Sequence, residues 1–186
     1  MTTRLVFAGY GGQGVILAGK LYCIAAMKHG YFVSHIPSYG VEMRGGTANC
    51  QVVVSDQEIP SPLVFAPHIA CVFNDPSLSK FGPLVRPEGS LLFNSSLIPE
   101  APALDGVEVF AVSANELAEE AGSLKAVNMA MLGALAALKP ELCTVEELMA
   151  SLPEAVSSRN QALNELNKRA LEAGFNALKG LTPLRV

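Results

Sequence analysis

Residues 4–14 read RLVFAGYGGQG, and residues 15–28 follow with apolar side chains at helical spacing. An apolar strand that runs through a glycine-rich turn into a helix leaves backbone N–H groups unpaired, where they can meet an anion or a carbonyl. Glycine fits such a turn because it reaches positive φ without strain and has no Cβ to hold a neighbouring backbone away. The stretch therefore predicts an α/β fold with a site at the edge of its sheet.

Strands and helices continue to alternate along the rest of the chain. Further strands are expected at residues 31–36, 48–55, 69–73, 90–93 and 107–112. We expect Pro37 to end the second strand, which would complete a right-handed βαβ unit with the first. The sequence thus predicts a three-layer Rossmann-like open sheet, mostly parallel, with helices on both faces, a helical C-terminal third and one domain over residues 1–186.

Several helix starts are predicted from capping residues. Asp75 is expected to cap a short helix that has Pro76 in its first turn and ends by residues 82–83. Three segments match the reciprocal capping pattern, in which a hydroxyl and a carboxylate or amide three residues later satisfy two backbone donors. These segments begin at Ser113, Thr144 and Ser158.

Residues 126–138 are apolar on nearly every side, yet they are too few to cross a bilayer, which takes about 20 residues. Ala130, Gly133, Ala134 and Ala137 share one helical face and permit close approach by another element. A helix without a polar face needs cover on both sides. We expect the sheet to supply one side, and a partner chain is a candidate for the other.

Composition narrows the possible functions. The chain has a net charge of −4 and a pI near 5.4, which argues against a surface for nucleic acid or an anionic membrane. Its four cysteines lie far apart with no CxxC pair, so we expect neither an iron–sulfur cluster nor a structural zinc site. They fit small buried side chains in a reducing cytoplasm, and the N-terminus shows no signal-peptide pattern.

Two segments near the N-terminus resemble nucleotide-binding motifs. Gly9, Gly11 and Gly14 match the spacing GxGxxG, but the second strand does not end in the acidic residue that would hold a ribose. Residues 14–20 resemble a phosphate-binding loop, but Leu21 stands where magnesium binding needs Ser or Thr. We therefore expect neither motif to bind a nucleotide.

A second glycine-rich segment, residues 38–47, reads SYGVEMRGGT. Arg44 could present its guanidinium to a carboxylate, a phosphate or a partner's backbone, or it could pair with Glu42 and only shape the loop. Tyr39 is either an interface anchor or a loop-packing residue. Asn128 is polar within an apolar helix and must find a hydrogen-bond partner, either in a loop such as the glycine turn or in a neighbouring subunit.

These segments together resemble the gamma subunit of 2-oxoacid:ferredoxin oxidoreductases. The resemblance rests on residues 9–14, 38–48, 52–56 and 128–133 and covers essentially the whole chain. The paired glycine segments at this spacing are more specific than a lone GxGxxG. Val41 departs from the family pattern, in which Pro is common at this position.

The resemblance implies a multi-subunit enzyme that converts a 2-oxoacid and coenzyme A into an acyl-CoA, carbon dioxide and reduced ferredoxin. Thiamine diphosphate would lie between alpha and beta subunits, and iron–sulfur clusters in other subunits such as a ferredoxin-like delta subunit. This chain would bind no cofactor alone and would be inactive alone. Its loops would contact partner subunits or a ligand near the coenzyme A entrance, and the residues concerned are Gly9, Gly11, Gly12, Gln13, Gly14, Ser38, Tyr39, Gly40, Glu42, Arg44, Gly45, Gly46 and Asn128.

Two other functions stay open at this point. A free-standing nucleotide-binding oxidoreductase would bind NAD(P) or flavin, which calorimetry would detect. A small adaptor on the same fold would assemble with a different enzyme, so only its partner would distinguish it. The sequence leaves the 2-oxoacid open, because the selection of the substrate side chain belongs mainly to the other subunits.

Overall fold

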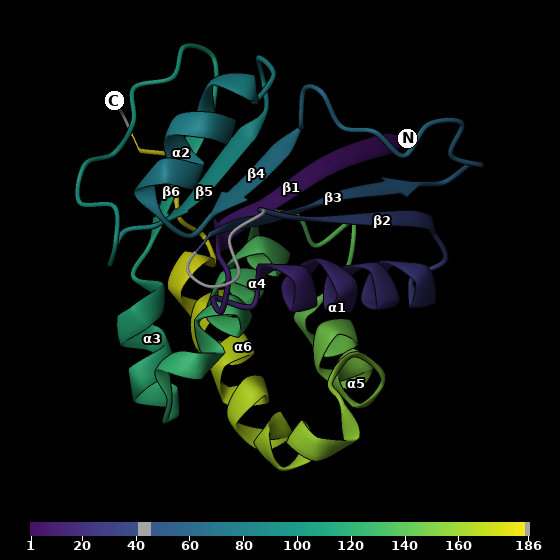
Figure 1. The fold of residues 1–186 in the computed structure, drawn as a ribbon, viewed down its shortest axis with the longest axis vertical. Helices are drawn as coiled ribbons and strands as arrows, with labels where there is room; N and C mark the ends of the chain where they lie inside the picture. The colour runs from purple at the N-terminus through teal and green to yellow at the C-terminus, as the bar shows by residue number, and fades with distance from the viewer. Residues whose placement is uncertain (41–45, 185–186) are drawn as a thin grey trace.

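A computed structural model describes residues 1–40 and 46–184 of the chain. Within these residues six strands form one sheet in the order β2-β3-β1-β4-β5-β6 (Figure 1). The strands are β1 (Thr2–Tyr10), β2 (Phe32–Tyr39), β3 (Thr47–Ser55), β4 (Ile69–Val72), β5 (Ser90–Asn94) and β6 (Glu108–Val112). Only β3 runs against its neighbours, and β1, β4, β5 and β6 pair in parallel. The predicted α/β fold with a mostly parallel sheet is confirmed.

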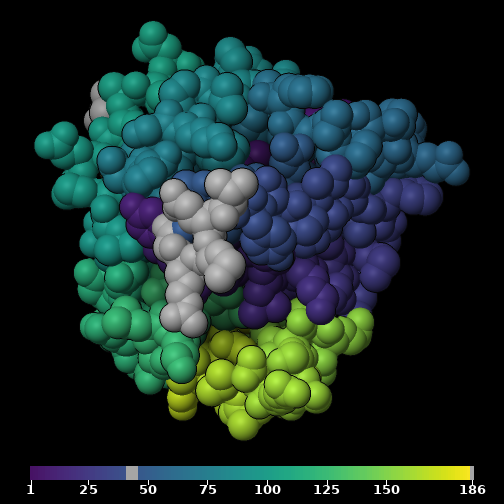
Figure 2. Space-filling view, viewed as in Figure 1, coloured from purple at the N-terminus to yellow at the C-terminus, as the bar shows by residue number. Residues whose placement is uncertain are grey.

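Helices cover both faces of this sheet. They are α1 (Val15–Lys28), α2 (Asp75–Phe81), α3 (Ala114–Ala121), α4 (Val127–Leu138), α5 (Val145–Ala155) and α6 (Asn164–Leu178). One face carries α2, and α1 and α4 cover the other, with α5 and α6 beyond them (Figure 1). The space-filling view shows these last helices, in green to yellow, as the lower part of the molecule (Figure 2). The C-terminal third is helical, as predicted.

The alternation of side chains along β1 divides the apolar core in two. Leu5 and Phe7 face the larger core beneath α1 and α4, whereas Val6 and Ala8 face the smaller core beneath α2. All four side chains are buried, because β1 lies inside the sheet and has a layer on each side. The continuous apolar run at the start of the sequence is therefore a central strand.

The second strand differs from the prediction, because it does not end at Pro37. Pro37 lies within β2, opposite Cys50 of β3. An edge strand tolerates proline, since it has a neighbouring strand on one side only. Ser38 and Tyr39, predicted to begin an irregular segment, complete this strand.

Strand β3 also changes the expected βαβ unit. It lies between β1 and β2 and is antiparallel to both, so β1 and β2 point the same way without touching. In a dinucleotide-binding fold the strand beside the first one carries the acidic ribose ligand. Here that place belongs to an antiparallel strand, which agrees with the rejection of a nucleotide motif.

Of the three predicted reciprocal caps, one is correct. The Thr144 hydroxyl accepts from the Glu147 backbone N–H at 3.3 Å, and the Glu147 carboxylate accepts from the Thr144 N–H at 2.8 Å. Ser113 makes no capping hydrogen bond at α3, and Ser158 lies inside a short 3₁₀ helix, so both of those predictions are wrong.

The predicted cap of α2 is displaced by one residue. Asn74, not Asp75, is the N-cap, and its side-chain oxygen accepts from the Ser77 N–H at 2.9 Å. Asp75 is instead the first helical residue, where a negative charge is favoured by the helix dipole.

Helix α4 is covered from within the chain, not by a partner chain. A Cβ added to Gly133 would lie 1.9 Å from the backbone oxygen of Leu171 in α6, and one added to Gly174 would lie 1.8 Å from that of Ala130. The two helix backbones are thus in contact through their glycines. The small-residue face of α4 is correctly predicted, but the element it meets is α6.

Candidate functional site

The first glycine turn connects β1 to α1 and is held by the side chain of Gln13. The Oε1 of Gln13 accepts from the Tyr10 N–H at 2.6 Å and from Nδ2 of Asn74 at 3.1 Å. Gly9 is needed beneath it, because an added Cβ would lie 2.6 Å from that same Oε1. Gln13 therefore ties the turn to Asn74, which follows the end of β4.

Asn128 holds the other end of the same turn. Its side chain is 3% exposed, and its Nδ2 donates to the backbone oxygen of Gly14 at 3.2 Å. Gly14 caps α1 with a φ of 75°, and an added Cβ would lie 2.6 Å from Nδ2 of Asn128. Of the two partners considered for Asn128, the structure shows the glycine turn.

The two glycine segments meet directly. The Gly11 N–H donates to the backbone oxygen of Gly46 at 2.8 Å. Within the second segment, the Gly40 N–H donates to the backbone oxygen of Thr47 at 2.9 Å. Glu42, Arg44 and Gly45 lie outside the described residues, so both interpretations of Arg44 stay predictions. Ser38 and Gly40 are exposed beside the junction. The two segments named as candidate contact loops therefore lie side by side, and their contact with a partner or ligand stays a prediction.

An exposed surface lies over this junction. Tyr39 is 69% exposed and Tyr10 is 38% exposed, and both line an apolar hollow of about 250 Å³ with the glycines of the turn. Gly12 has a φ of 101°, and an added Cβ there would meet no described atom within 4 Å. The turn is thus firmly held on its inner side, and no atom of residues 1–40 or 46–184 covers Gly12 on its outer side.

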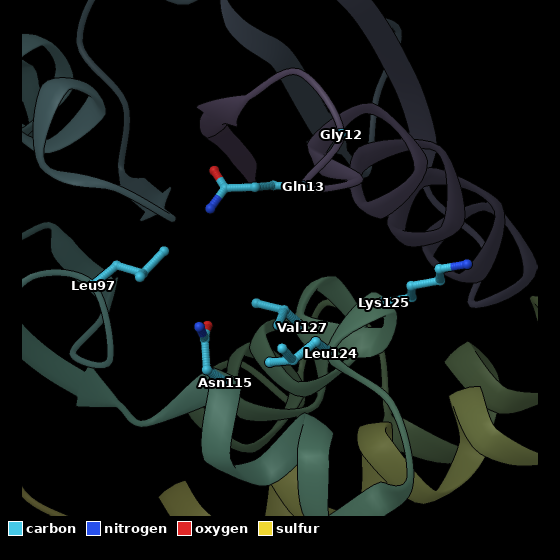
Figure 3. Close-up of a pocket in the computed structure, with 7 residues that line it drawn as sticks. All are labelled: Gly12, Gln13, Leu97, Asn115, Leu124, Lys125 and Val127. Atoms are coloured by element: carbon cyan, nitrogen blue, oxygen red, sulfur yellow. The ribbon is translucent and has the colours of Figure 1, made fainter. Parts of the chain in front are cut away.

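A second pocket of about 190 Å³ adjoins Gly12 at the carboxyl ends of the parallel strands (Figure 3). It is the position at which open α/β sheets bind ligands. Its walls come from the first glycine turn, the segment after β5, the start of α3 and the start of α4. The residues lining it are Gly12, Gln13, Leu97, Asn115, Leu124, Lys125 and Val127.

The sequence identified only Gly12 and Gln13 of these residues. Asn115 was hidden in an apparent capping pattern, and Leu124 and Lys125 precede α4 in a short 3₁₀ segment. Their positions in the sequence could have revealed Leu97 and Asn115, since each follows a buried parallel strand by a few residues.

The four cysteines lie within the larger core as free thiols. Burial raises the pKa of Cys23 and of Cys50 to about 12, and it also raises the pKa values of Cys71 and Cys143. Because the thiolate is the reactive form, we expect no thiol to react with Ellman's reagent at pH 8 while the chain is folded, and all four to react in denaturant. A thiol that reacted within seconds in the native chain would show that at least one cysteine is accessible and not buried in the core.

The described part of the chain holds neither a candidate metal site nor a candidate membrane span. Residues 1–40 and 46–184 contain no group of three or more His, Cys, Asp or Glu side chains placed to hold a metal ion. In the same ranges no helix has the length and apolar character needed to span a membrane.

Comparison with known proteins decides the family. The family described as pyruvate ferredoxin/flavodoxin oxidoreductase matches residues 4–177. The chain belongs to this family. It is 35% identical over 171 residues to the ketoisovalerate oxidoreductase subunit VorA of Methanothermobacter marburgensis, covering 92% of this chain and 35% of that protein. It is 33% identical over 181 residues to the 2-oxoglutarate synthase subunit KorC of the same organism, covering 94% and 95%. The chain thus spans about a third of the length of VorA and nearly all of KorC.

Solved structures of the family share the fold. The gamma subunit of a keto/oxoacid ferredoxin oxidoreductase from Geobacter sulfurreducens superposes with a TM-score of 0.80 at 27% identity, covering 95% of this chain and 98% of that one. The 2-oxoglutarate:ferredoxin oxidoreductase from Magnetococcus marinus has a TM-score of 0.86 at 23% identity, covering 98% of this chain and 32% of that one. The second likeness concerns the fold alone. The predicted resemblance to gamma subunits is confirmed.

Proposed function

We propose that this chain, as one gamma-type domain, is the gamma subunit of a thiamine diphosphate-dependent 2-oxoacid:ferredoxin oxidoreductase. The complex would convert a 2-oxoacid, coenzyme A and oxidised ferredoxin into an acyl-CoA, carbon dioxide and reduced ferredoxin. Support comes from the family match and from KorC, which has nearly the same length and is a subunit of a 2-oxoglutarate synthase. The 2-oxoacid itself stays open, since the relatives are named for ketoisovalerate, 2-oxoglutarate and indolepyruvate.

The contribution of this chain is to hold the catalytic subunits together. The observation that carries this role is Gly12, whose outer side no described residue covers while Gln13 and Asn128 hold the turn from within. A backbone with no Cβ lets a second polypeptide approach closely. Tyr39 and Tyr10 beside it offer the aromatic surface that is common at interfaces. We assign the outer face of the glycine junction to contacts with alpha and beta subunits.

Other subunits would supply the redox and thiamine chemistry. In this proposal thiamine diphosphate lies between alpha and beta subunits, and a ferredoxin-like delta subunit carries clusters that reduce ferredoxin. The Magnetococcus marinus enzyme contains bound coenzyme A and succinyl-CoA, and we expect coenzyme A to enter near the glycine junction here too. Buried free thiols suit a reducing compartment, so we expect a cytoplasmic complex.

The test compares Gly12→Val with Gly30→Val. Both glycines have φ near 100°, at 101° and 108°, and an added Cβ would meet no described atom within 4 Å, so each substitution should destabilise the isolated chain by about 1–3 kcal/mol through backbone strain. Gly30 lies after α1, at the other end of that helix from the glycine turn. Only Gly12→Val should weaken assembly, by roughly tenfold or more.

Assembly is measured by size-exclusion chromatography of the chain co-expressed with its neighbouring subunits, and stability by thermal melting of the chain alone. If the two variants assemble equally well, Gly12 is not part of the interface. Purification of the tagged chain from its native host as a lone polypeptide would overturn the proposed function as a whole.

A further inference from the structure

The pocket beside Gly12 presents hydrogen-bond donors whose orientation the backbone dictates. The Oε1 of Gln13 is occupied by the Tyr10 N–H and by Nδ2 of Asn74, and Asn74 is itself oriented by the Ser77 N–H. Backbone N–H groups can only donate, so they fix which atom of each carboxamide is the oxygen. The Nε2 of Gln13 is left with one long contact, 3.5 Å to the backbone oxygen of Phe73.

A similar relay orients Asn115 on the opposite wall. The backbone N–H groups of Ala114 and Ser96 both donate to Oδ1 of Asn94, at 3.2 Å each. Asn94 is fully buried, and its Nδ2 donates to Oδ1 of Asn115 at 3.0 Å. The Nδ2 group of Asn115 therefore has no partner among the described residues, and Figure 3 shows both carboxamides reaching into the pocket.

Among the described residues, the charged side chain that lines this pocket is a lysine. Lys125 is at the rim, its ammonium directed away from Asn115, and makes no ion pair with any described residue (Figure 3). The lining includes no Asp or Glu. Glu116 follows Asn115 in the chain and lies outside the lining, where its carboxylate stays ionised and accepts from the hydroxyl of Ser96. A group that only accepts hydrogen bonds and carries negative charge complements this pocket.

Resting on the proposed function for the existence of a partner, we propose that this pocket receives a carboxylate side chain of a neighbouring catalytic subunit. Two neutral amides donate into the pocket, and the ammonium of Lys125 has to swing inward from the rim to reach the same group, which suits a single negative charge. The volume of about 190 Å³ is smaller than the roughly 300–1,000 Å³ of pockets that enclose whole small ligands. Leu97 and Leu124, 43% and 50% exposed, flank the entrance and suit apolar residues beside the incoming carboxylate.

Carbodiimide cross-linking of the assembled complex tests the contact directly, because the reagent joins an ammonium to a carboxylate that touches it. We expect mass spectrometry to find Lys125 joined to an Asp or Glu of another subunit. Two ion pairs inside this chain are positive controls: Lys28 with Glu154 at 2.5 Å and Lys168 with Glu165 at 2.6 Å. If both controls react and Lys125 joins nothing, the proposed contact is absent.

A second measurement uses Asn115→Asp, which keeps the acceptor for Asn94 but replaces the pocket donor with a repelling oxygen. We expect its binding to the subcomplex expressed without the chain to weaken at least about tenfold, and Asn160→Asp, an exposed site between α5 and α6, to change it less than about twofold. Similar binding of the two variants would overturn the inference while leaving the proposed function intact. If no complex forms with the unaltered chain, the proposed function itself fails.

The same cross-linking is repeated with coenzyme A added at saturation. A carboxylate from the partner should keep its cross-link to Lys125 in the presence of the coenzyme. If coenzyme A abolishes that cross-link, or if Asn115→Asp weakens coenzyme binding and leaves assembly unchanged, the anion is a phosphate of the coenzyme and the inference is wrong.

Discussion

Replacement of Gly174 by alanine is expected to destabilise the chain severely. The added Cβ would lie 1.8 Å from the backbone oxygen of Ala130 and 2.7 Å from its carbonyl carbon. These atoms belong to α4, whose residues are nearly all buried, so they cannot move aside as a flexible side chain could. Separating the two helices would open the larger core, and we expect the free energy of unfolding to fall by about 4 kcal/mol or more.

Thermal melting and far-ultraviolet circular dichroism of the purified chain measure this effect. Gly133→Ala should behave alike, because its Cβ would lie 1.9 Å from the backbone oxygen of Leu171. Gly11→Ala is the matched control, since its Cβ would make an ordinary 3.5 Å contact with Gly46. A Gly174→Ala chain that melted within a few degrees of the unaltered one would show that α4 and α6 can separate without loss of stability.

The contact between α4 and α6 was predictable from the sequence only in part. The face formed by Ala130, Gly133, Ala134 and Ala137 is visible in the helical spacing, so close approach by another element is predictable. The identity of that element is not, because Gly174 lies about 40 residues further on and reads as an ordinary position in an amphipathic helix. Local periodicity indicates that a face is buried, but only tertiary packing decides what buries it.

The capping predictions fail for a similar reason. Ser113 and Glu116 have the same spacing as Thr144 and Glu147, yet only the second pair bonds reciprocally. At α3 the first backbone donor is satisfied by Asn94, twenty residues earlier, and the hydroxyl of Ser96 bonds the carboxylate of Glu116. A pattern four residues long cannot reveal a competing partner from a neighbouring strand end.

The candidate site, too, was predictable only in part from the sequence. The two glycine segments are recognisable because each is continuous in the sequence, and the hydrogen bond from Gly11 to Gly46 joins them. The pocket beside them is assembled from four separate segments, each contributing one to three side chains. Asn115 and Lys125 carry no motif of their own, so the pocket could be found only after the strand order brought those segments together.

Asn94 connects the stability of the fold to the polarity of that pocket, and two substitutions separate these roles. Asn94→Leu should lower the free energy of unfolding by about 3 kcal/mol, because the buried N–H groups of Ala114 and Ser96 lose their acceptor. Asn94→Asp keeps an acceptor for both and should melt much closer to the unaltered chain. Above the pKa of the introduced carboxyl its second oxygen cannot donate to Asn115, so the carboxamide of Asn115 must turn over to donate in its place.

The turned carboxamide would present its oxygen to the pocket, where an incoming carboxylate would be repelled. We therefore expect Asn94→Asp to weaken assembly roughly tenfold at nearly unchanged stability, although residue 94 is fully buried and cannot touch a partner. Chemical shifts of the Asn115 side-chain amide report the turnover independently of assembly. If the amide turns over and assembly is unaffected, the donors of the pocket are not what the partner recognises. If Asn94→Asp weakens assembly only as much as it lowers the melting temperature, Asn94 supports the loop without setting the polarity of the pocket.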